Sequence, residues 1–150
     1  MASVQSLITV QQLYIAYYQR PGDPAGMLFW ATQLDANGGD LGDIDDSFGS
    51  SPESMELYGP INSATIGSVI DAIYLALFNR APDAAGKQFY IDGFNNGTFT
   101  ATSIAYNVLV GAQNEDAVAV EDKTLVANRF TQIVDGRGFL NPLFGTGVEF

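Results

Sequence analysis

The sequence contains no cysteine and no histidine. The first absence excludes disulfides and thiol nucleophiles. The second removes the usual base of serine hydrolases and the commonest transition-metal ligand. We therefore expect no enzymatic activity. The alternative is a pair of carboxylates of the glycosidase type, Asp43 and Asp83, but no pocket-forming motif accompanies them.

Basic residues are also scarce. Six lysines and arginines face 17 aspartates and glutamates, which gives the 150-residue chain a net charge of −11. Such a field repels polyanions, and the basic residues are scattered along the sequence instead of forming a patch. We expect no nucleic-acid binding.

Long apolar runs are missing as well. No stretch approaches the roughly 18 residues of a transmembrane helix, so we expect no membrane-spanning segment. The N-terminus lacks the basic region and apolar stretch of a cleaved secretion signal. Absent cysteine, scarce lysine and abundant glycine match the composition of type I-secreted bacterial surface proteins. We expect an extracellular location at the cell surface, reached without a cleaved N-terminal signal.

The strongest signal present is an internal duplication. The aligned segments, 60 residues apart without a gap, are residues 13–20 and 73–80, 23–26 and 83–86, and 29–30 and 89–90. Internal repeats of this kind indicate a fold built from one repeated supersecondary unit. We predict one domain, residues 1–150, made of two repeats (5–58 and 65–116), a C-terminal helix (122–134) and an apolar tail (135–150).

Each copy has the pattern of a helix, a tight turn and a second helix. Apolar residues recur at i, i+3 and i+4, which predicts amphipathic helices. Thr9 is expected to cap the first helix, and Arg20 to end it. Asp23 and Asp83 are the expected caps of the second helices. The fold class predicted is therefore all-α, a compact bundle of two duplicated helix-turn-helix units of about 60 residues.

Other positions carry packing expectations. Gly26 and Gly86 lie in the first turn of the second helices, which indicates a close approach of neighbouring helices. Phe29 and Phe89, which follow in the same helices, are expected to be buried. In the C-terminal helix, apolar residues recur in phase, which predicts an amphipathic helix. They are Leu125, Val126, Phe130, Ile133 and Val134.

The segment Leu77–Tyr90 resembles a helical repeat domain of bacterial surface-layer proteins and of hemolysin-type calcium-binding proteins secreted by type I systems. The hallmark of that domain is Asn-Arg-x-Pro-Asp-x-x-Gly between an apolar helix and an aromatic pair. In the first copy the proline is displaced by one position, to Pro21. The resemblance implies a non-catalytic domain that anchors a surface layer by holding lipopolysaccharide O-antigen.

A polysaccharide site needs aromatic faces beside planar polar groups. The candidates are Tyr17, Arg20, Asp23 and Trp30, which lie around the first inter-helix turn. Tyr17 and Trp30 differ from their repeat partners, as expected if one copy kept a site. The alternative is that the polar pair caps helices and the aromatic pair fills the core. Because the chain is acidic, we expect a weakly charged O-polysaccharide as partner, or a calcium bridge.

A second candidate site is an acidic segment that suits calcium, which prefers oxygen ligands. Its members are Asp35, Asn37, Asp40, Asp43, Asp45 and Asp46. The segment has neither EF-hand spacing nor a glycine-rich nonapeptide. The alternative is that Asp40 caps a helix and the other carboxylates form its solvated face.

A second class of function is a protein–protein assembly module that builds a lattice or oligomer. Here the apolar tail after Gly136 would lie across a neighbouring subunit. Binding to polysaccharide would favour anchoring. A concentration-dependent oligomer that needs the segment Phe139 to Phe150 would favour assembly.

Overall fold

Capping residues set where most helices begin. Asp23 accepts a hydrogen bond from the Gly26 amide (2.8 Å) at the start of α2 (Pro24–Ala36), and Asp83 does the same for Gly86 (3.0 Å) in α6 (Ala84–Asn95). Both caps were predicted. The prediction for Thr9 was wrong, because Ser3 caps α1 (Val4–Leu13) and leaves Thr9 within the helix.

The computed structural model describes residues 2–135, and within that range the chain has no strand. The remaining elements are η1 (Tyr14–Tyr18), α3 (Gly42–Gly49), α4 (Pro52–Tyr58), α5 (Ile66–Phe78), α7 (Ala101–Val110) and α8 (Asn114–Val134). The predicted all-α class is confirmed. No helix in the described part of the chain is long and apolar enough to cross a membrane. The predicted tail lies outside the described residues, apart from Asp135.

The first repeat comprises α1, η1, α2, α3 and α4, and the second comprises α5, α6, α7 and the start of α8, so further helices follow the helix-turn-helix pair in each copy. Arg20 binds Glu53 on α4, and its counterpart Arg80 binds Asp116 at the start of α8. Helix α8 is thus the second-copy equivalent of α4, extended to 21 residues. The predicted C-terminal helix, residues 122–134, is the later part of α8, which begins earlier, at Asn114.

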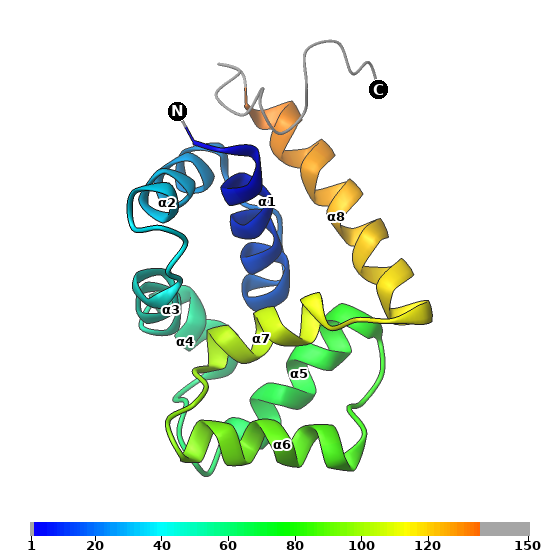
Figure 1. Ribbon diagram of the computed structural model, residues 1–150. Helices are drawn as coiled ribbons and strands as arrows, with labels where there is room; N and C mark the ends of the chain where they lie inside the picture. The colour runs from blue at the N-terminus through cyan, green and yellow to red at the C-terminus, as the bar shows by residue number, and fades with distance from the viewer. Residues whose placement is uncertain (1, 136–150) are drawn as a thin grey trace.

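The core lies where α1, η1, α5 and α7 meet. Figure 1 shows α1 between α2 and α8, with α7 and α5 crossing one end of it. The largest buried apolar side chains come from both copies and include Leu7, Leu13, Ile70, Ile73 and Ile104. Neither repeat has a core of its own, since the same apolar cluster runs through both.

A buried polar network fastens α8 to the first copy. The Gln11 side chain donates to Thr131 Oγ1 (3.0 Å) and Asn128 Oδ1 (3.2 Å), and accepts from the Gly22 amide (2.8 Å). Thr131 in turn donates to the Gly22 carbonyl (2.7 Å). Because Gln11 is 1% exposed, these bonds satisfy polar groups that water cannot reach.

The close helix approach predicted at Gly26 and Gly86 is found in the first copy only. A Cβ added at Gly26 would collide with the Tyr14 hydroxyl, so α2 and η1 approach closely there. At Gly86 an added Cβ would meet only the side chain of the capping Asp83, at 3.0 Å. The glycine is therefore a packing requirement in the first copy and not in the second.

Candidate functional site

Tyr17, predicted as an exposed sugar platform, lies in the core. It is 0% exposed, its hydroxyl lies 2.6 Å from Ser54 Oγ, and its ring centroid lies 5.1 Å from that of Tyr58. This burial raises the pKa of the Tyr17 phenol. Because no face of the ring reaches solvent, Tyr17 presents no surface on which a sugar can stack. The alternative reading, a core aromatic, describes this residue.

Arg20 is held in place by its neighbours. Its Nε and Nη2 atoms lie 2.6 and 3.0 Å from the two carboxylate oxygens of Glu53, and Nη1 donates to the Pro21 carbonyl (2.8 Å). The guanidinium also lies over the rings of Tyr14 and Tyr18, 5.1 and 5.5 Å from their centroids. Such a bidentate, stacked arginine fixes the turn between two helices.

The second copy repeats this arrangement. Arg80 contacts both carboxylate oxygens of Asp116, at 3.2 and 2.5 Å, and its guanidinium lies over the rings of Tyr74 and Phe78. Since the same contacts recur at the same position of each repeat, the arginine has a structural role in both copies. Asp23 likewise caps α2. The four predicted sugar residues therefore do not form one exposed site.

Exposed aromatic rings lie on α2 and α6, the helices that Asp23 and Asp83 cap. Phe29 is 54% exposed and its ring stands at 77° to that of the partly buried Trp30, with centroids 4.9 Å apart. In the second copy Phe89 is 61% exposed and meets Tyr90 at 70°, with centroids 5.3 Å apart. The prediction that both phenylalanines are buried was wrong. Helical periodicity missed them because their helices are apolar on more than one face.

The six residues proposed as calcium ligands lie in separate local environments. Asp35 accepts hydrogen bonds from the Ser3 amide (2.6 Å) and from the hydroxyls of Ser3 (2.7 Å) and Ser6 (2.6 Å), which lower its pKa. Asn37 exchanges hydrogen bonds with the backbone of Asp40 at 3.0 and 3.1 Å. These contacts close the end of α2 against α1 and the following loop, so they explain three of the six residues.

The other three carboxylates lie at the start of α3. Asp43 and Asp46 are exposed, whereas Asp45 is partly buried, and this burial raises its pKa to about 6. Within residues 2–135 no group of three acidic side chains is arranged to hold a metal ion. The structure thus does not bring the predicted calcium ligands together.

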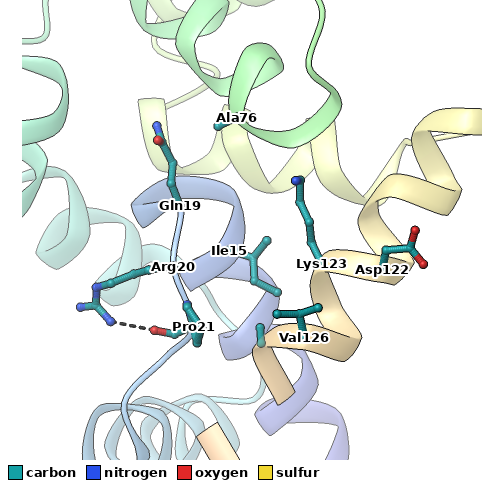
Figure 2. A pocket seen from close by; sticks show the side chains of 9 residues that line it. Ile15, Gln19, Arg20, Pro21, Ala76, Asp122, Lys123 and Val126 are labelled. Carbon is teal, nitrogen blue, oxygen red and sulfur yellow. Dashed lines mark hydrogen bonds between the residues drawn. The ribbon is translucent and has the colours of Figure 1, made fainter. Parts of the chain in front are cut away.

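A pocket that the sequence did not predict lies beside η1 (Figure 2). Its volume is about 380 Å³, and it is lined by Ile15, Gln19, Arg20, Pro21, Ala76, Asp122, Lys123, Val126 and Ala127. These residues come from η1 and the turn after it, from α5 and from α8, so both copies contribute. In Figure 2, Ile15 and Val126 face one another, and Lys123 extends from α8 towards the side where Ala76 lies.

Local backbone geometry distinguishes this pocket from the equivalent region of the second copy. Residues 14–18 form a π-helix, whereas the aligned residues 74–78 continue an ordinary α-helix. Both helices end in a left-handed residue, Gln19 (φ 60°) and Asn79 (φ 55°). Single-turn π-helices are rare and are frequent at functional sites. The widened turn occurs on the side of the molecule that carries the pocket.

The solvent-exposed side of α8 carries several large apolar side chains among its charged ones. Leu125, Val126 and Ile133 are 62%, 68% and 72% exposed, and Val118 is 56% exposed. The buried face of the helix carries small residues, such as Ala127 and the hydrogen-bonded Thr131. The apolar periodicity in the sequence is real, but within the described chain it marks the outside of the helix.

Comparison with known proteins gives one match. A family described as a domain of unknown function (DUF4214) matches residues 45–117, which run from within α3 into the first turn of α8. No curated protein and no solved structure matches the chain. The family match places the similarity across both copies and assigns no activity.

Proposed function

We propose that this protein is a non-catalytic assembly module of a bacterial cell surface, which associates with a second copy of itself through α8. The observation that carries the proposal is the exposed apolar face of α8, from Val118 to Ile133. Large exposed apolar patches, especially those rimmed by polar residues, mark interaction sites on protein surfaces. Assembly accounts for this face, and the buried Tyr17 removes the main reason for preferring the predicted sugar site.

The occupant follows from the order of residues along this face. Pairing two α8 helices antiparallel about the Leu125–Val126 position places Val118 opposite Ile133 of the second copy. The same register places Asp122 opposite Arg129, so that opposite charges meet twice in a two-fold arrangement. Self-complementary patches of this kind are what a symmetric dimer requires. A parallel pairing would oppose like charges at both positions.

The interface is expected to be weak. A seam formed by one helix is smaller than the roughly 20–30 residues a side of a stable interface, and each chain carries a net charge of −11. We therefore expect a dimer that forms with rising protein concentration and tightens with salt, since salt screens repulsion between the two acidic chains.

Sedimentation velocity over a wide concentration range tests the proposal. Ile133→Asp should abolish the dimer and leave the helical spectrum intact, because the side chain is 72% exposed. Val110→Asp, which changes an exposed valine outside α8, is the matched control and should dimerise as the parent does. A chain ending at Asp135 should also dimerise. A monomeric parent whose truncated form dimerises would show that the chain's own tail covers α8.

Charge exchange tests the register itself. Asp122→Arg and Arg129→Asp should each weaken the dimer, and the two substitutions together should restore it. If the double variant is as weak as either single one, the antiparallel register is wrong.

A second candidate function is anchoring to surface polysaccharide, favoured by the exposed rings of Phe29 and Phe89. Each lies beside a second aromatic at the same position of its repeat, which offers two equivalent platforms for sugar rings. The test is binding of purified O-polysaccharide by the parent and by a Phe29→Ala, Phe89→Ala double variant. Met55→Ala, at another exposed apolar residue, is the control. Unchanged binding by the double variant would contradict this location.

A further inference from the structure

The pocket beside η1 has the composition of a small-molecule site. Its volume of about 380 Å³ falls in the range of ligand pockets, about 300–1,000 Å³. Five of its nine lining residues are apolar: Ile15, Pro21, Ala76, Val126 and Ala127. Ligand sites typically combine such a lining with a few polar groups that fix orientation.

Lys123 supplies the charge that decides which ligand fits. Arg20, Arg80 and Lys87 are each engaged in an ion pair at 2.8 Å or less. Lys123 makes no hydrogen bond or ion pair with any residue in the range 2–135, although it belongs to a strongly acidic chain. Figure 2 shows its side chain extending along the pocket, while Arg20 and Asp122 turn away from it. The charged group that extends along the pocket is therefore the Lys123 ammonium, with the Asp122 carboxylate at the rim.

From this geometry we propose that the pocket binds a small monocarboxylate with a short apolar body. The carboxylate pairs with the Lys123 ammonium group, a charge-assisted hydrogen bond. The apolar body lies between Ile15 and Val126, against Ala76. The Asp122 carboxylate at the rim disfavours a second negative charge on the ligand, so a monocarboxylate is favoured over a phosphate-like dianion. The pocket shares Val126 and Asp122 with the proposed α8 seam, so its ligand is tested on the monomer; it does not depend on polysaccharide binding.

Titration with sodium hexanoate, followed by amide chemical shifts, tests the assignment at a protein concentration where the chain is monomeric. We expect saturable shifts centred on Ala76, Val126 and Lys123. Acetate has the head group without the body, and hexylammonium has the body with the opposite charge. Both should bind at least tenfold more weakly. Comparable binding of hexylammonium would overturn the role of Lys123.

Two variants separate the contributions of charge and shape. Lys123→Met keeps the length of the side chain and should weaken hexanoate binding at least tenfold, whereas Lys87→Met removes a lysine already paired with Asp71 and should leave it unchanged. Ala76→Leu should fill the pocket and abolish binding. Lys123 is exposed, so its variant remains informative even if Ala76→Leu fails to fold. Absence of saturable binding, or full binding by Lys123→Met, refutes the proposal.

Discussion

Replacing Gln11 with leucine removes the centre of the network that joins α8 to the first copy. The two side chains are similar in size, so the change leaves little cavity, but three hydrogen bonds are lost. The Gly22 amide keeps no partner within this network and remains buried. A buried polar group without a partner costs about 1–3 kcal/mol, and with the bonds to α8 we expect a loss of about 3 kcal/mol in unfolding free energy.

Urea unfolding followed by circular dichroism measures this loss. For a chain of this size it corresponds to a fall of about 6–12 °C in melting temperature. Gln12→Leu is the matched control: the neighbouring side chain is only partly buried and makes no hydrogen bond within the described chain, so we expect less than about 0.5 kcal/mol. A double-mutant cycle with Thr131→Val should show strong non-additivity. Equal effects of the Gln11 and Gln12 variants would refute the reasoning.

Two further predictions concern the repeats and the acidic segment. Gly26→Ala should destabilise the protein by about 1–2 kcal/mol in urea unfolding through its collision with Tyr14, whereas Gly86→Ala should be neutral or stabilising by up to about 1 kcal/mol. Equal losses would contradict the packing described. The partly buried Asp45 carboxyl has its pKa raised to about 6, above the unfolded value of about 3.9. Its contribution to stability is therefore full below pH 4 and is lost as pH rises through 6. Asp45→Asn should therefore raise the unfolding free energy at pH 7 by about 1 kcal/mol, after allowance for the partial exposure of the side chain. The unfolding free energy should also vary less between pH 4 and 7 in this variant. The same pH dependence in variant and parent would contradict the prediction.

Much of the fold was predictable because it depends on local signals. The caps Asp23 and Asp83 and the repeat alignment identified α2 and α6, since each signal acts within a few residues. The π-helix was not predictable, because the aligned residues 14–18 and 74–78 have nearly the same pattern, yet only the first segment is a π-helix. Sequence also cannot say which side of a helix meets the core when both sides carry apolar residues, as in α8.

The candidate sites were less predictable than the fold. Tyr17 was chosen because it differs from Leu77 in the other copy, yet that difference reflects a buried hydroxyl paired with Ser54. The pocket at η1 depends on residues more than 100 positions apart, Ile15 and Val126 among them. No short sequence motif predicts this pocket, because the pocket forms only where α8 packs against the first copy.

The long reach of α8 has a consequence for how the chain acquires its structure. Gln11 meets Thr131, 120 residues later in the sequence, and α1 also packs against α7. During synthesis, at about 5–20 residues per second, the first copy must wait several seconds for the segments that complete its interior. Contacts of such separation also slow folding, because a long loop must close before they form. The two copies can be told apart in the sequence, but we expect them to fold together as one unit.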